Sequence, residues 1–263
     1  MARFDSYPQG TPSWIEHSGP DPEASKQFYA GLFGWQYDDR PMHDGETVIG
    51  TYSMARVEGD VVAGLSPRFG QDADSDASWG VYLAADDVDT AVARAREAGG
   101  RVEVEPVDVG EEGRMAWVHD PVGALVGLWQ GRSFAGSQRA NEHGTTTWNE
   151  LVTGEGERAL PFYEAVLGVT AGVVPMGDGA EPYTTLEVQG RSVGGIMAPH
   201  GDGEPAHWNV YFHVDDADEA ARRTVELGGQ QVVAPFDVPG IGRMAAMADP
   251  QGARFNLMQP PAE

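Results

Sequence analysis

The stretch that decides the fold reads WGVYL at residues 79–83, and it recurs as WNVYF at residues 208–212. The second copy starts 129 residues after the first. At the same offset, GRMA at 113–116 recurs as GRMA at 242–245. Ordered recurrence of this kind is the mark of an internal repeat. The chain is therefore predicted to be a duplication of one structural unit.

Nearer the start the same duplication is visible at a slightly different offset. Phe28-Tyr29 recurs as Phe162-Tyr163, and Trp14 with Glu16 recurs as Trp148 with Glu150, all 134 residues later. The change of offset indicates a short length difference between these blocks. The acidic segment 71–77 is the expected place for it.

Each half is predicted to contain two βαβββ units. In the first, a strand over 12–18 precedes a helix that begins at Asp21-Pro22-Glu23, where an N-cap, a first-turn proline and an early acid coincide, and ends at Gly34. Period-2 patterns predict three further strands near 36–39, 47–57 and 61–65. The second unit is predicted as a strand over 80–84, a helix over 88–98 and strands near 101–105, 114–119 and 124–129. The fold class is α+β, with four such units forming two domains with cup-shaped mixed sheets.

The domains are expected at residues 8–132 and 146–261. Residues 133–145 are glycine-rich and polar, which is typical of a linker.

Four units in this order resemble the vicinal oxygen chelate superfamily. The resemblance is carried by helix starts of the type Asp-x-Glu...Phe-Tyr...Leu-x-Gly and by the closing Asp-Pro-x-Gly hairpins at 120–123 and 249–252. It covers about 12–130 and 147–259. The superfamily includes glyoxalase I, extradiol dioxygenases, fosfomycin-modifying enzymes and bleomycin-binding resistance proteins. It implies that paired units curl into a cup for a small ligand, with a divalent metal in the enzymes and none in the binding proteins.

The resemblance also implies where metal ligands would stand, and the chain lacks His, Glu and Gln there. These positions hold Trp14, Gly64, Gly80 and Gly127 in the first half, and Trp148, Gly195, Asn209 and Asn256 in the second. His17 lies nearby, but strand alternation points it away from the face of Trp14. We therefore expect no metal and no other cofactor.

The same alternation predicts which side chains line the two cups. We expect Glu16, Glu150 and His213 to be the candidate acid–base residues. Ligand contacts are expected from Trp14, Tyr82, Trp129, Trp148, Asn209, Tyr211, Arg254, Asn256 and Met258. Aromatic walls with a carboxylate suit a flat, partly apolar ligand that carries an amine. Two alternatives remain open: the aromatic rings plug the cups, or Arg114 and Arg243 pair with the two glutamates and make them structural.

Two functions follow. The first is a metal-independent small-molecule binding protein of the glyoxalase/bleomycin-resistance type that holds an aromatic or polyketide-like metabolite or antibiotic. The alternative is a metal-independent enzyme, acting as an isomerase, cyclase, lyase or hydroxylase on a polyketide-like or small carbonyl substrate. Asn209 and Asn256 replace glycines of the first half, so the second cup is predicted to be the more polar. If one half binds and the other only scaffolds, the second cup is the one expected to bind.

Composition restricts the partners. The formal charge of −24 argues against nucleic acid and against anionic membranes. The chain has no cysteine, and neither a long apolar run nor a secretory leader is evident. A cytoplasmic protein is expected, as a monomer or homodimer.

Overall fold

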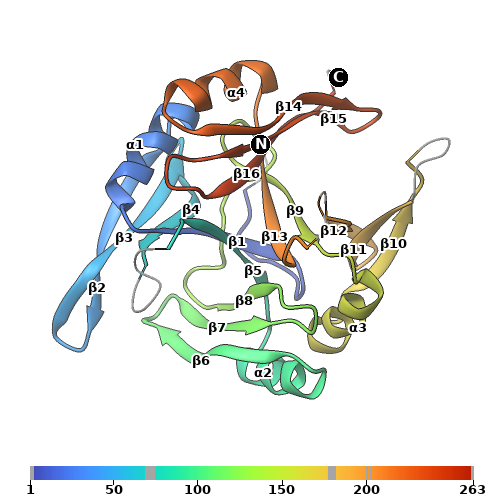
Figure 1. The fold of residues 1–263 in the computed structure, drawn as a ribbon. Helices are drawn as coiled ribbons and strands as arrows, with labels where there is room; N and C mark the ends of the chain where they lie inside the picture. Colours follow the sequence, from blue (N-terminus) through green and yellow to red (C-terminus); the bar gives the residue numbers. More distant parts are fainter. Residues whose placement is uncertain (1–2, 69–74, 177–181, 200, 202, 262–263) are drawn as a thin grey trace.

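The computed structural model describes residues 3–68, 75–176, 182–199, 201 and 203–261. Part of the predicted acidic segment 71–77 lies outside these ranges. The described chain forms two eight-stranded mixed sheets with two helices each (Figure 1). The α+β class with four βαβββ units is confirmed.

The first half contains ten elements in the predicted order. They are β1 (Pro12–Gly19), α1 (Pro22–Phe33), β2 (Gln36–Asp44), β3 (Thr47–Val57), β4 (Asp60–Pro67), β5 (Ser78–Ala84), α2 (Val88–Glu97), β6 (Arg101–Val109), β7 (Gly113–His119) and β8 (Leu125–Gly131). Strands β2 and β6 extend further than their sequence patterns predicted.

The second half repeats this order. Its elements are β9 (Thr146–Val152), α3 (Gly156–Leu167), β10 (Thr170–Val174), β11 (Tyr183–Val188), β12 (Arg191–Met197), β13 (His207–His213), α4 (Ala217–Glu226), β14 (Gln230–Val238), β15 (Gly242–Ala248) and β16 (Arg254–Gln259). Between β8 and β9 the chain forms no named helix or strand.

Each sheet is built from the four strands of two βαβββ units, and the two units join through the first strand of each. In the first sheet the order is β2-β3-β4-β1-β5-β8-β7-β6, and the second has the same order, β10-β11-β12-β9-β13-β16-β15-β14. β1 pairs antiparallel with β5, with Glu16 opposite Gly80, and parallel with β4, with Glu16 beside Gly64. This register places Glu16 at the centre of the first sheet.

Local signals explain the helix ends. The carboxylate of Asp21 accepts a hydrogen bond from the backbone N–H of Ala24 (3.0 Å), and Pro22 is the first helical residue. α1 ends where Gly34 adopts a left-handed conformation (φ 73°), and α3 ends in the same way at Gly168 (φ 71°).

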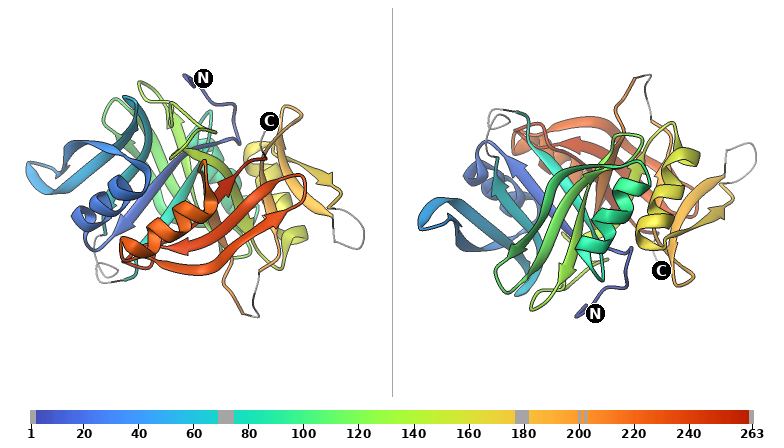
Figure 2. Two further views of the ribbon diagram at one scale, coloured as in Figure 1. Left: turned by 90° about the horizontal axis from the view of Figure 1, so that it is seen from above. Right: turned by 90° about the horizontal axis from the view of Figure 1, so that it is seen from below.

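The two halves share one apolar core, which contains side chains from both. α1 packs beside α4 and α2 beside α3, as the two views of Figure 2 show. The halves exchange buried hydrogen bonds: Tyr29 donates to the carboxylate of Asp249 (3.1 Å), and Tyr163 donates to that of Asp120 (2.8 Å). Each aspartate opens an Asp-Pro-x-Gly hairpin, so the repeated motif also joins the halves.

His17 adds an asymmetric contact to this interface. Its Nε2 lies 2.8 Å from Oδ2 of Asp249, and both side chains are fully buried. The equivalent position in the second half is Leu151. The prediction that His17 points away from the face of Trp14 is confirmed. No helix of the described chain is both long and apolar enough to cross a membrane.

Candidate functional site

The first cup is the concave face of the first sheet, and a hydrogen-bonded carboxylate lies at its centre. Trp14 Nε1 donates to the hydroxyl of Tyr52 (3.0 Å), which donates to Glu16 Oε2 (2.9 Å). Ser66 Oγ donates to Glu16 Oε1 (3.0 Å), and the hydroxyl of Tyr82 also bonds to this carboxyl group. Burial raises the pKa of Glu16, and these hydrogen bonds oppose the rise.

The second cup, the concave face of the second sheet, contains the same Trp, Tyr, Glu and Tyr members, with Met197 in place of Ser66. Trp148 Nε1 donates to the hydroxyl of Tyr183 (3.0 Å), which donates to Glu150 Oε1 (2.5 Å). The hydroxyl of Tyr211 donates to Glu150 Oε2 (2.7 Å). Burial and then the charge of Glu150 raise the pKa values of Tyr183 and Tyr211, so both phenols stay protonated and act as donors.

Two members of this network, Tyr52 and Tyr183, were missed from the sequence. They are 131 residues apart, as are Gly64 and Gly195, and this offset lies between the 134 and 129 of the stronger repeats. An alignment that allowed the offset to change gradually could have found the pair. The contact itself depends on tertiary register, since Tyr52 lies two strands away from Glu16.

The hypothesis that Arg114 and Arg243 pair with the two glutamates is wrong. Arg114 Nε bonds to Asp89 (2.8 Å), and Arg243 Nε bonds to Asp218 (2.5 Å). Both aspartates lie in the helices that cover the convex faces. Alternation along β7 and β15 therefore turns the arginines away from the cups.

The first cup is filled by its own side chains. Trp14, Tyr82 and Trp129 are 5%, 4% and 7% exposed, and they form one cluster with Met54 and Val61. Phe134 packs against this cluster and meets the Trp14 ring edge-on, with 5.0 Å between ring centroids. The aromatic residues predicted as ligand contacts in this half are therefore packed against each other.

Glycines in the floor of the first cup make room for these rings. A Cβ atom at Gly80 would lie 2.5 Å from Cη2 of Trp117, and one at Gly127 would overlap the ring of Tyr82. A Cβ at Gly64 would overlap the hydroxyl of Tyr52. The residues at the implied metal positions of this half are thus glycines on which aromatic rings lie.

The second cup lacks most of this filling. Ala246 stands at the position of Trp117, Met258 at that of Trp129, and Thr185 at that of Met54. Trp148, Asn209, Asn256 and Met258 are only half-buried, whereas Glu150 is 4% exposed. A buried carboxylate therefore lies beneath partly exposed aromatic and amide side chains.

Comparisons with known proteins identify the fold family. Residues 13–128 match the family model of the Glyoxalase/Bleomycin resistance protein/Dioxygenase superfamily, and residues 150–258 match the model of a glyoxalase-like domain. The protein CFP32 of Mycobacterium tuberculosis, whose name carries a provisional assignment as a glyoxylase, is 43% identical over 99% of this chain and 98% of its own length. The chain belongs to this superfamily.

Other similar proteins share fewer identical residues with this chain. The anthracycline biosynthesis protein DnrV of Streptomyces peucetius is 33% identical over 98% of this chain and 95% of its own. The 2,3-dioxygenase LapB of Pseudomonas sp. KL28 has the same fold, with a TM-score of 0.64, 16% identity and coverage of 97% and 94%. The Mn(II)-bound glyoxalase of Novosphingobium aromaticivorans gives a TM-score of 0.61 at 19% identity, covering 98% of this chain and 83% of that one.

The metal that enzymes of the superfamily use does not fit the residues of either cup. A divalent metal site needs about three protein ligands of His, Asp or Glu type. In the parts of the chain that the structure describes, no such group of three is found. The carboxylates at the centres of the cups, Glu16 and Glu150, are already bonded to phenolic hydroxyls.

The remaining predicted residues of the second cup lie at different depths. Asn209 pairs with Glu150 across β13 and β9, and its Oδ1 lies 3.1 Å from Nε2 of His207. Arg254 lies exposed at the start of β16, and its Nη1 is 3.4 Å from Oε1 of Glu204. We place Arg254 at the rim of the cup and Asn209 beside its floor.

The structure separates His213 from Glu150. His213 is four residues beyond Asn209 on β13, which is about 13 Å along a strand. Burial lowers the pKa of His213, and nearby charges on Asp215 and His143 act on it in opposite directions. Glu150 and His213 are therefore two separate groups and not a hydrogen-bonded pair.

Proposed function

We propose that this protein binds a flat, cationic aromatic metabolite or antibiotic in its second cup, without a metal. The observation that carries the proposal is the buried carboxylate of Glu150, held by Tyr183 and Tyr211 beneath half-exposed Trp148. A carboxylate this deeply buried is costly to ionise unless it has partners. Two phenol donors lower that cost, and a ligand ammonium group would lower it further.

Aromatic rings beside the carboxylate favour the same ligand. Trp148 and Tyr211 face the cup from adjacent strands, with Tyr211 opposite Trp148 in the pairing of β13 with β9. Aromatic faces attract a cation and stack on a flat ring. The net charge of −24 adds a long-range attraction for a positively charged molecule.

Amide and thioether side chains complete the proposed site. Asn209 and Asn256 are half-buried and supply both donors and acceptors, which suits the hydroxyl and carbonyl groups of a polyketide-like ligand. Met258 offers an adaptable apolar contact. Arg254 would meet the outer edge of the ligand at the rim.

We assign the first cup a scaffolding role. Its Trp14, Tyr82 and Trp129 are buried in mutual contact, which leaves Glu16 satisfied by Tyr52 and Ser66. The relationship to a protein named for anthracycline biosynthesis supports the ligand class, because anthracyclines are flat polycyclic aromatic molecules.

Tryptophan fluorescence tests the proposal. Titration with proflavine, a flat cationic aromatic dye, should quench the tryptophan fluorescence of the wild type. In Trp148→Phe most of that quenching should be lost. Trp14→Phe is the matched control, since it alters the equivalent residue of the filled cup, and it should quench as the wild type does. Prior dialysis against a chelator should leave the titration unchanged. Equal loss in both variants, or dependence on added metal, would refute the proposal.

A second candidate function is acid–base catalysis at the same residues. The hydrogen bonds from Tyr211 and Tyr183 to Glu150 place exchangeable protons at a carboxyl group in a partly buried cup. Such a group can abstract a proton next to a carbonyl group, as an isomerase, cyclase or lyase requires. His213 would act at a separate position.

One measurement distinguishes the binding function from the catalytic one. Incubation with a polyketide-like or small carbonyl compound that binds should return the compound unchanged if the protein only binds it. Product formation that is lost in Glu150→Gln, with binding retained, would instead establish the enzyme.

A further inference from the structure

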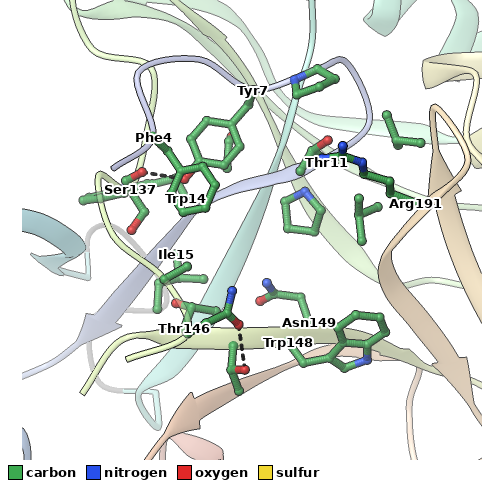
Figure 3. Close-up of a pocket in the computed structure, with 18 of the residues that line it drawn as sticks. Phe4, Tyr7, Thr11, Trp14, Ile15, Ser137, Thr146, Trp148, Asn149 and Arg191 are labelled. Atoms are coloured by element: carbon green, nitrogen blue, oxygen red, sulfur yellow. Dashed lines mark hydrogen bonds between the residues drawn. The ribbon is translucent and has the colours of Figure 1, made fainter. Parts of the chain in front are cut away.

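A cleft of about 820 Å³ lies between the two halves. Trp14 and Trp148 of the cups are among the residues that line it, whereas Glu16 and Glu150 are not. Its walls are the N-terminal arm (residues 4–8), the start of β1, the start of β9 and the hairpin of β11 and β12 (Figure 3). The arm is held in place by a hydrogen bond from the Tyr7 hydroxyl to the carbonyl oxygen of Ser137 and by one from Phe4 N to Gln138 O (3.0 Å). The volume lies in the range of small-molecule sites.

Buried polar atoms without partners line this cleft. The side-chain oxygens of Thr11, Thr146 and Asn149 are buried and make no hydrogen bond within the described chain. All three residues border the cleft, and Asn149 is only 6% exposed. A buried polar group without a partner costs about 1–3 kcal/mol, so three of them around one space indicate a ligand or water that bonds to them.

Of these three residues, Asn149 is the most informative, because its counterpart in the first half is an apolar residue on the other wall of the cleft. The equivalent residue of the first half is Ile15, which also borders the cleft. The duplicated position is therefore apolar on one wall and a hydrogen-bond acceptor on the other. Such a two-faced space fits an aromatic ring that carries a donor at one edge.

Charge gives the cleft a preference. The chain contains 41 acidic residues, yet none of the described residues that line this cleft is acidic. Its only charged lining residue is Arg191, at the start of β12, which is exposed and makes no ion pair within the described residues. An anionic group is therefore favoured at that end.

We propose that this cleft is a second ligand site, distinct from the Glu16 and Glu150 centres of the cups, for an aromatic carboxylate that also carries a hydroxyl group. The carboxylate would meet Arg191, the ring would lie among Ile15, Tyr7 and Phe4, and the hydroxyl would donate to Asn149. The site takes a ligand of the opposite charge to the one proposed for the second cup, so the two proposals stand or fall separately.

The test uses 4-hydroxybenzoate and two-dimensional amide NMR of the whole protein. Binding should shift the amides of residues 11–15 and 146–149, together with the side-chain amide of Asn149, and leave those of 254–258 unmoved. Arg191→Gln should weaken binding about fivefold, as expected for an exposed ion pair, and should not weaken the neutral analogue 4-hydroxybenzyl alcohol. Arg158→Gln, an exposed arginine on α3, is the matched control.

Asn149→Leu should weaken both compounds at least tenfold, because both use the hydroxyl donor. Thr146→Val removes a second orphaned hydroxyl and should weaken binding less, which keeps the test valid if Asn149→Leu does not fold. The proposal is overturned if 4-hydroxybenzoate moves no amide of the cleft up to its solubility limit. It is also overturned if Arg158→Gln weakens binding as much as Arg191→Gln.

Discussion

Replacing Gly80 by Asn would place in the filled cup the residue that the open cup has at Asn209. A Cβ atom at Gly80 would lie 2.5 Å from Cη2 of Trp117 and 3.4 Å from two further atoms of that ring. Overpacking of this kind costs about 1–3 kcal/mol. At roughly 2–4 °C per kcal/mol for a chain of this size, Gly80→Asn should lower Tm by about 2–12 °C.

The partner substitution separates the clash from other effects. Trp117→Ala copies Ala246 of the second cup and removes the ring, at a cost of about 2 kcal/mol, which is roughly half that of a fully buried tryptophan. The double variant has no ring to clash with Asn, so it should be about as stable as Trp117→Ala alone. The predicted coupling between the two substitutions is thus about 1–3 kcal/mol.

Denaturant unfolding of the wild type, both single variants and the double variant measures this coupling. Gly80→Ala is a useful control, since its Cβ alone should cause most of the cost of Asn. If the two substitutions add to within about 0.5 kcal/mol, the ring of Trp117 does not fill the space above Gly80 and the account of a filled first cup is refuted.

Two further predictions concern buried carboxylates. Asp249→Ala should lower the free energy of unfolding by about 3–5 kcal/mol, since it leaves both His17 and Tyr29 unpaired at the junction of the halves. Asp120→Ala leaves Tyr163 unpaired but no histidine, and each substitution also removes the acceptor of two backbone N–H groups, so Asp120→Ala should cost about 1–3 kcal/mol less. Equal denaturation midpoints would contradict this. Burial raises the pKa of Glu16 above its ordinary value of 4.5, so the folded protein holds this proton more tightly than the unfolded chain. The stability that this preference contributes is fully present below pH 4.5 and is lost as pH rises through the raised pKa. Glu16→Gln does not ionise, so its stability relative to the wild type should increase between pH 4 and pH 7, and a pH-independent difference would show that Glu16 is not protonated more readily in the folded state.

The fold could be predicted because its signals are local and occur more than once. Asp21, Pro22 and Gly34 mark the ends of one helix, and the recurrence of WGVYL and GRMA fixes the order of the units that follow. Strand alternation also placed Trp14 and Glu16 on one face, as the register of β1 with β5 confirms.

Side-chain partners were harder to predict because they depend on which strands are neighbours and on which face each residue lies. Tyr52 reaches Glu16 from β3, across β4, and no local pattern gives that contact. Arg114 was a reasonable candidate partner by charge alone, but alternation along β7 turns it toward Asp89. The cleft between the halves involves the arm, the linker and a hairpin, so only the assembled structure reveals it.

The choice between a plugged cup and an open one was left undecided by composition, since both cups contain Trp and Tyr. The difference lies in Trp117 against Ala246 and in Trp129 against Met258. These pairs are visible in the repeat, but their meaning depends on knowing that both positions face the concave side of the sheet.

Isothermal titration calorimetry with a flat aromatic cation tests the central claim most directly. Wild type, Glu150→Gln and Glu16→Gln would each be titrated with proflavine and with a neutral anthraquinone of similar size. We expect one proflavine site per chain, at least tenfold weaker binding in Glu150→Gln because a charge-assisted contact is lost, and no change in Glu16→Gln or for the neutral compound. Two equal sites per chain, or equal weakening by both substitutions, would contradict the assignment of binding to the second cup.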